Sequence, residues 1–279
     1  MGTSAKALKI RIKSVQSTEH ITRAMQLVAS SKLRRASERM ERGRAYFKTM
    51  QEVFAGISES GYNEESVYYC PKNCGNTYMI VIAGDRGLAG GYNNNVFNLA
   101  RSIEGDQNVT ILPIGKKSYE YFSKKGYALD GGLCPVDDLT KEDCARIGKN
   151  IAASYVQGKY DRVVIVFTNF VNMLSQIPAE IQVLPLEKPE NTKGEQSFTL
   201  YEPSASAVLG AVIPEYLSGM LYSAACESIA CEQAARRNAM DSATKNADEM
   251  IEKLSLQYNR ARQGAITQEI TEIVAGSEQ

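Results

Sequence analysis

The sequence has no long apolar run. Its longest apolar stretches, MIVIA at 79–83 and VVIVF at 163–167, are far shorter than the about 20 residues that a membrane-spanning helix needs. The apolar segment of a secretory signal peptide is also missing from residues 1–20. We therefore expect a protein that is soluble or attached peripherally to a membrane, and whose cysteines stay reduced.

Catalytic and metal-binding patterns are missing as well. The chain has one histidine, His20, so no Ser–His–Asp or Cys–His set can be assembled around a second one, and no pair of carboxylates is marked as an acid–base couple. Among the six cysteines, Cys70 and Cys74 are four positions apart and Cys134 and Cys144 ten, which does not match the short paired spacings of zinc sites. The sequence thus predicts no catalytic residue, no metal site and no cofactor.

Proline is absent from both ends of the chain. All eight prolines lie from Pro71 to Pro214, so each end is free to form one long helix. Small or apolar residues recur there at gaps of three and four, which is typical of a coiled-coil seam. We expect an antiparallel coiled coil of the two ends, with the C-terminal helix running from Glu215 to Gly276; two separate helices packed on the middle of the chain are the alternative. The N-terminal stripe is Leu8, Ile12, Val15, Thr22, Met25, Ala29 and Ala36; the stronger part of the C-terminal stripe is Met240, Ala243, Ala247, Met250 and Leu254, continuing to Gln257.

The middle of the chain alternates strand-like and helix-like segments. Strands are expected at 77–83, 109–114 and 161–170, with a proline-marked edge strand at 177–187. Helices are expected at 93–103, 116–126 and 138–158, the last with Thr140 as N-cap and Asp143 completing a capping box. The predicted fold class is therefore a long antiparallel coiled coil with an inserted Rossmann-like α/β domain. The expected domains are 1–60, 75–205 and 206–279.

Positive charge is concentrated at the N-terminus. The chain has no net charge, but residues 1–50 hold twelve Lys and Arg against three Glu. Such an arm is typical of contact with nucleic acid, a membrane surface or an acidic protein. Residues 30–44 carry six of these cations but no interleaved aromatic side chains and no recognition motif, so an acidic protein surface fits at least as well as nucleic acid.

A glycine-rich loop, AGDRGLAGGYNNN at 83–95, follows the first expected strand. Such loops can hold a phosphate, but Gly90 and Gly91 are followed by Tyr92 and Asn93 instead of the Lys-Ser/Thr of a P-loop. The spacing of its glycines is not G-x-G-x-x-G either. A nucleotide-binding α/β protein with helical arms therefore stays an alternative with weak support, and the glycines are expected to serve turns and close packing.

Three segments resemble one family, the γ subunit of F-type ATP synthase. They are KIRIKSVQSTEHITRAMQLVASSKLRRA at 9–36, GDRGLAGGYNNN at 84–95 and YNRARQGAITQEITEIVAGSE at 258–278, in the family's order across nearly the whole chain. Two positions depart from the family. Many members have cysteine where this chain has Ala89, and the family usually has alanine where this chain has Ser277. The resemblance implies a central rotor shaft that transmits torque between a membrane c ring and a catalytic ring of three α and three β subunits, without being catalytic itself.

The resemblance also implies partners and contact residues. The partners would be the α, β and ε subunits and the c ring, with one copy of this chain per complex, no nucleic acid and no membrane span of its own. A place at the cytoplasmic face of a bacterial inner membrane is expected because no transit peptide is present. Asp85 and Arg86 are candidates for an internal ion pair or a stator contact. The motif positions assign β-subunit contacts to Met25, Lys32, Arg34, Arg35, Arg262 and Gln263, a sliding tip to Ile266, Thr267, Glu269, Ile270 and Ile273, and a foot near the c ring to Tyr201 and Glu202.

Overall fold

The computed structural model describes residues 5–59, 67–69, 75–105, 108–186 and 205–277. They fall into two compact units, one of residues 1–30 with 236–279 and the other of residues 31–235, and each unit is described by itself. Two long helices, α1 (Ala5–Glu59) and α5 (Ala205–Ser277), contribute to both units. The expected domain limits near residues 60, 75 and 205 remain predictions.

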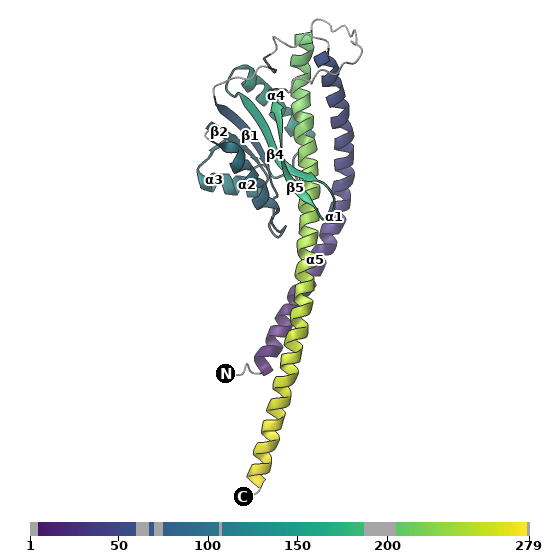
Figure 1. Cartoon of the computed structure of the whole chain (residues 1–279), viewed down its shortest axis with the longest axis vertical. Helices are drawn as coiled ribbons and strands as arrows, with labels where there is room; N and C mark the ends of the chain where they lie inside the picture. The colour runs from purple at the N-terminus through teal and green to yellow at the C-terminus, as the bar shows by residue number, and fades with distance from the viewer. Residues whose placement is uncertain (1–4, 60–66, 70–74, 106–107, 187–204, 278–279) are drawn as a thin grey trace. The chain divides into compact units, whose positions relative to one another are not determined.

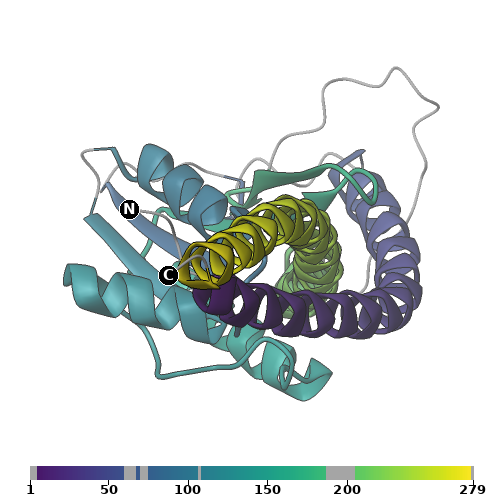
Figure 2. The ribbon, with the colours of Figure 1, turned by 90° about the horizontal axis from the view of Figure 1, so that it is seen from below.

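In the first unit, the start of α1 and the end of α5 form an antiparallel pair. Thr22 Oγ1 lies 2.8 Å from Thr244 Oγ1, and the Gln26 amide donates to Asp241 Oδ1 at 2.9 Å. A higher number on α1 is matched by a lower number on α5, so the helices run in opposite directions, and they lie side by side in Figure 2. The predicted antiparallel helical pair is confirmed.

The buried face of α5 differs from the predicted stripe at alternate positions. Met240, Ala247 and Leu254 are buried as expected, but Met250 is 43% exposed and Gln257 is exposed. At these alternate positions the more buried residue is the next one in the sequence. Thr244 is buried in place of Ala243, and Ile251 and Tyr258 are half-buried in place of Met250 and Gln257. Sequence reading chose Ala243 and Met250 for their apolar character, whereas the structure buries Thr244 because its hydroxyl has a partner on α1.

The N-terminal stripe is confirmed as a buried or half-buried face, and it contains more polar residues than predicted. Leu8 and Ala29 are buried, and Ile12, Val15 and Met25 are half-buried. Glu19, which the prediction omitted, is 6% exposed and lies 2.7 Å from the Arg23 guanidinium. The face therefore includes a carboxylate, a hydroxyl and an amide as well as apolar side chains.

In the second unit, a five-stranded sheet has the order β3-β2-β1-β4-β5. The strands β1 (Asn76–Ile82), β2 (Asn108–Ile114), β3 (Ala128–Leu129) and β4 (Arg162–Phe170) are parallel, and β5 (Gln176–Leu184) is an antiparallel edge strand. The predicted mostly parallel sheet and its proline-bearing edge strand are confirmed. The two-residue β3 was missed because it is too short for an alternating pattern.

Helices cover both faces of this sheet (Figure 1). The helices α2 (Tyr92–Glu104) and α3 (Lys116–Lys125) pack with Met79 and Val81 of β1 on one face. The helix α4 (Lys141–Val156) and the first part of α5 pack with Tyr78 and Ile80 on the other. Alternating β1 side chains therefore enter two different cores, as expected for a parallel sheet.

The local signals for the ends of α3 and α4 were read correctly. Thr140 accepts from the Asp143 amide, and the Asp143 carboxylate accepts from the Thr140 amide, which completes the predicted capping box. The helix α3 ends at Gly126, whose φ of +76° is left-handed. Both features depend on neighbouring residues alone, so sequence was enough to find them.

The predicted start of α5 at Glu215 was wrong. The helix begins at Ala205 and contains Pro214 in its interior. An internal proline costs about 3 kcal/mol because it removes one hydrogen bond and crowds the carbonyl four residues earlier. Leu209, Ile213 and Leu217 are all buried in the core beneath β1 and β4, and burial of such side chains contributes about 1.5–3 kcal/mol each, which outweighs the proline.

Candidate interaction surfaces

The glycine-rich loop at 83–95 is held in place by its own hydrogen bonds. The Asp85 carboxylate accepts from the backbone amides of Lys116 (2.8 Å), Val136 (3.2 Å) and Asp137 (3.1 Å). Lys116 is the first residue of α3, whose N-cap Gly115 supplies no side chain, so Asp85 caps this helix from a distant loop. The structure gives Asp85 an internal role, on backbone amides rather than on Arg86.

The same loop packs closely on α5. A Cβ built on Gly84 would lie 2.7 Å from the Glu232 carboxyl carbon, so a side chain there would force Glu232 to move. The Gly84 amide donates to Asn93 Oδ1 at 2.9 Å, and the Tyr92 hydroxyl donates to the Ser228 carbonyl at 3.0 Å. The glycines thus allow close packing, and the Gly84 amide that could face an anion already has a partner.

The exposed side chains of this loop are those of Arg86, Leu88, Asn94 and Asn95. Arg86 is exposed, and Leu88 is 65% exposed with a φ of +62°. A left-handed φ is uncommon for a leucine, and residues held in such conformations cluster at functional sites. Arg86 and Leu88 are therefore among the parts of the loop that are available to another molecule.

Three of the four α1 residues expected to face an acidic partner are exposed, and the fourth, Met25, is half-buried. Lys32, Arg34 and Arg35 all lie at the surface, and the Arg34 side chain is 86% exposed, 3.7 Å from Glu38. An exposed pair of this kind contributes little to stability, so these cations are free to bind elsewhere.

Sequence reading missed the role of Arg44, the last cation of the run at 30–44. Its guanidinium donates to the Phe170 carbonyl and forms an ion pair with Glu227 Oε1, which also accepts from the Phe170 amide at 2.9 Å. Arg44 therefore ties α1 to α5 and to the end of β4. No local pattern could have found a pair that is separated by 183 positions in the sequence.

The C-terminal part of α5 is exposed throughout residues 262–274. Arg262 and Gln263 begin this segment, and its apolar side chains Ile266, Ile270 and Ile273 are 46%, 56% and 71% exposed. These three isoleucines are four and three positions apart, so they share one side of the helix. Thr267 donates its hydroxyl to the Gln263 carbonyl, and Glu269 is exposed.

The remaining predictions concern Tyr201 and Glu202, a metal site and a membrane span. Tyr201 and Glu202 lie outside the described residues. Within the described ranges, no cluster of three or more His, Cys, Asp or Glu side chains could hold a metal ion. The described helices also include none long and apolar enough to cross a membrane.

The described thiols are unreactive by environment. Cys144, Cys226 and Cys231 are buried and Cys134 is half-buried, all as free cysteines. Burial raises the pKa of Cys144 to about 12, so its thiol is neutral at physiological pH.

Fold and surfaces together define a class of protein in which two terminal helices pair antiparallel, flank an α/β domain, and expose charged and apolar side chains for contact with other molecules. Comparison with known proteins gives the family. The family model described as ATP synthase matches residues 4–279. The ATP synthase gamma chain of Ruminococcus albus is 47% identical over 98% of this chain and 97% of its own length, and that of Alkaliphilus metalliredigens is 43% identical over 100% and 99%.

The sodium ion specific gamma chain of Acetobacterium woodii is 38% identical over 100% of this chain and 99% of its own length. A chain in the structure of the Euglena gracilis mitochondrial ATP synthase OSCP/F1/c-ring has the same fold, with a TM-score of 0.70 at 19% identity over 98% of this chain and 93% of that chain. The protein belongs to the ATP synthase gamma-chain family.

Proposed function

We propose that this chain is the central-stalk rotor subunit of an F-type ATP synthase and carries torque without making or breaking bonds itself. In this proposal its paired helices enter the ring of three α and three β subunits, and its α/β domain lies with the ε subunit and the c ring. One copy is present per complex, as a peripheral subunit on the cytoplasmic face of a bacterial membrane. Family membership over residues 4–279 supports the assignment.

The observation that carries the proposal is the exposed end of α5, residues 262–274. Since Thr22 lies opposite Thr244, the first described residue of α1, Ala5, lies opposite about residue 261 in an antiparallel pair. Residues 262–274 continue beyond that level and are all exposed. An exposed helix with isoleucines on one side has apolar surface that a partner can cover. A shaft that ends inside a ring of subunits would have such a tip.

The tip is suited to sliding contact. Its charged residues from Gly264 to Val274 are Glu269 and Glu272, which have the same sign, and the rest are apolar or neutral. Apolar contact is non-directional, so it can be exchanged between subunits as the shaft turns. Ile266, Thr267, Glu269, Ile270 and Ile273 are proposed to line this bearing.

Further contacts are proposed for residues outside the tip. Arg262 and Gln263 would meet a loop of a β subunit, and the Lys32, Arg34 and Arg35 face, together with Met25, would meet the acidic lever segment of β. Arg86 is a proposed stator contact, and Tyr201 and Glu202 are proposed to lie near the c ring. Rotation would couple to chemistry because these contacts differ among the rotary states, and only differential contacts can shift an equilibrium.

Co-expression with the α and β subunits of the same organism tests the proposal. We expect a stable complex in which ATP hydrolysis turns this chain. The rotation would be observed with a probe attached to this chain's helix α3 (Lys116–Lys125). Failure to assemble, or an assembled complex that hydrolyses ATP while this chain stays still, would contradict the assignment.

Arg262→Ala tests the residue-level proposal in that complex. Loss of one charge-assisted hydrogen bond costs about 1.5–3 kcal/mol, so we expect rotation or ATP synthesis to fall about tenfold or more. Arg260→Ala is the matched control, because Arg260 is also exposed but two positions away, on a different side of α5. Equal turnover in both variants would refute the contact.

A further inference from the structure

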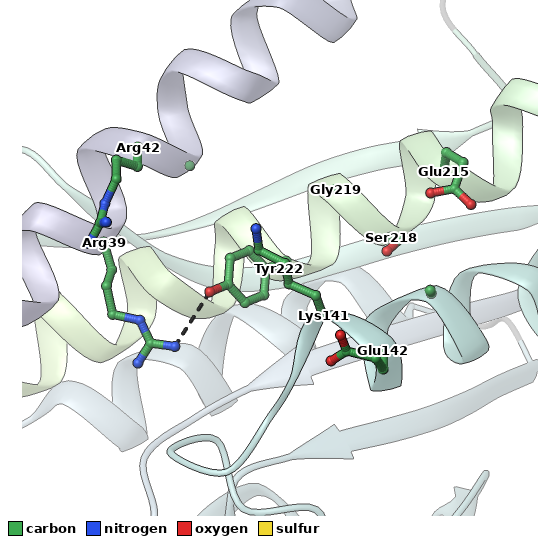
Figure 3. Close-up of a pocket in the computed structure, with 10 residues that line it drawn as sticks. Arg39, Arg42, Lys141, Glu142, Glu215, Ser218, Gly219 and Tyr222 are labelled. Atoms are coloured by element: carbon green, nitrogen blue, oxygen red, sulfur yellow. Dashed lines mark hydrogen bonds between the residues drawn. The ribbon is translucent and has the colours of Figure 1, made fainter.

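A cavity of about 610 Å³ lies within the second unit, between α1, α4 and α5 (Figure 3). Its volume is in the range of small-molecule sites, about 300–1,000 Å³. None of the proposed rotor contacts lines it. Small residues shape it, among them Ala145 of α4 and Ser218 of α5.

Positive charge gathers at one end of the cavity. Arg39 and Arg42 line it from α1, where Arg42 Nε also donates to the Glu38 carbonyl at 3.1 Å, and Lys141 lines it from the first turn of α4. The Arg39 guanidinium donates to the Tyr222 hydroxyl at 3.4 Å, and the Lys141 ammonium lies 5.6 Å from the centre of the Tyr222 ring. Tyr222 thus contacts one cation from α1 and one from α4. The hydrogen bond from Arg39 to Tyr222 also raises the pKa of Arg39 above its ordinary value.

Negative charge lies elsewhere on the cavity wall. Glu215 is seven residues before Tyr222 on α5, which is about 10 Å along a helix, and Glu142 projects from the first turn of α4. Both carboxylates are exposed to solvent. A ligand with negative charge at both ends would be repelled by Glu215, whereas hydroxyl groups would find acceptors in the two carboxylates and in Ser218.

We propose that this cavity is a binding site for a small phosphorylated polyhydroxy compound, with the phosphoryl group on Arg39, Arg42 and Lys141 and the hydroxyl groups toward Glu142 and Glu215. Guanidinium groups suit phosphoryl oxygens because their donors form a planar fork. This inference is independent of the proposed rotor function, since it uses only residues of the second unit.

Glucose 6-phosphate is a suitable probe, with glucose and inorganic phosphate as its two halves. We expect glucose 6-phosphate to bind the full-length chain in calorimetry and to raise its melting temperature with increasing concentration. Inorganic phosphate should bind at least tenfold more weakly because it lacks the hydroxyl contacts, and glucose should not bind measurably. Equal affinity for inorganic phosphate and glucose 6-phosphate would overturn the polyhydroxy part of the proposal, and no binding of either would overturn the whole.

Variants locate the site. Arg39→Gln and Lys141→Gln should each weaken binding of glucose 6-phosphate about tenfold or more, and Glu215→Gln should weaken it less because an amide oxygen still accepts hydrogen bonds. Lys149→Gln is the matched control, since Lys149 is exposed on α4 and does not line the cavity. Ala145→Leu should block binding by filling the cavity. If Lys149→Gln weakens binding as much as Lys141→Gln, the effect is one of overall charge and the site is refuted.

An occupant that is a protein segment would give a different result. In that case the Arg39 and Lys141 variants would weaken assembly with partner subunits, while glucose 6-phosphate would change neither the melting temperature of the free chain nor its assembly. That outcome would also overturn the proposal. The affinity of the free chain for the probe separates this test from that of the rotor function, which is measured only in the assembled complex.

Discussion

The Asp85 carboxylate offers a sharp test of how the glycine-rich loop works. It accepts from three backbone amides, those of Lys116, Val136 and Asp137. Asp85→Ala would leave all three without this acceptor. Lys116 and Asp137 are exposed, so their amides can turn to water, whereas Val136 is 2% exposed and its amide would lose its partner.

The expected cost follows from these environments. Loss of a helix cap costs about 0.5–2 kcal/mol, and an unsatisfied buried amide costs about 1–3 kcal/mol. We therefore expect Asp85→Ala to lower the free energy of unfolding by about 2–4 kcal/mol. Asp85→Asn should lower the free energy of unfolding by less than Asp85→Ala, because asparagine keeps one oxygen acceptor. It should still be destabilising, because its NH2 group faces a backbone amide donor.

Urea denaturation followed by circular dichroism measures the loss, and hydrogen exchange locates it. The amides of Lys116, Val136 and Asp137 should lose protection more than the rest of the sheet. Asp138→Asn is the control, since Asp138 is exposed in the same segment. A change below about 0.5 kcal/mol for Asp85→Ala, the level of an ordinary surface substitution, would refute the capping role and return Asp85 to the candidates for a stator contact.

Two further substitutions and one labelling experiment have expected outcomes. Glu227→Ala removes the acceptor shared by Arg44 and the Phe170 amide. Because the Arg44 side chain is 45% exposed and can be solvated, the main cost is the half-buried Phe170 amide left without this acceptor, so the free energy of unfolding in urea should fall by about 1–3 kcal/mol, and a change as small as that of a surface residue would contradict the tie. Cys144, with a pKa raised to about 12, should resist iodoacetamide at pH 8 in the folded chain and react once urea unfolds it; equal rates by mass spectrometry would show that the thiol is accessible. Met25→Lys adds a cation close to Arg23, so it should bind the proposed acidic lever too strongly and lower ion pumping per ATP in the assembled complex; unchanged pumping would rule out that contact.

The α/β domain was predictable because its signals are local. Apolar runs predict the strands, and the Thr140 capping box and Gly126 mark helix ends within a few residues of themselves. Pro214 shows where local reasoning fails. Its effect on a helix is unfavourable by itself, and only the core around Leu209 and Ile213, assembled from distant strands, makes the helix continue through it.

The candidate contact surfaces divide in the same way. Lys32, Arg34 and Arg35 are not members of the apolar stripe of α1, so their exposure was predictable from the sequence. Arg44 belongs to the same cationic run, yet it is held by Glu227 and Phe170, which approach it only after folding. A cation on a helix face is therefore available to a partner only where no distant carboxylate of the same chain reaches it.

The register of the helical pair depends on its polar residues. Apolar side chains alone allow a seam to slip by one position, which is the error that placed Ala243 and Met250 on the buried face. Thr22 and Thr244 remove this freedom, because a shift would separate two buried hydroxyls that bond at 2.8 Å. Polar seam residues in coiled coils specify register at a cost in stability. A pair of helices that must keep its alignment under load has reason to carry such residues where a purely apolar seam would be more stable.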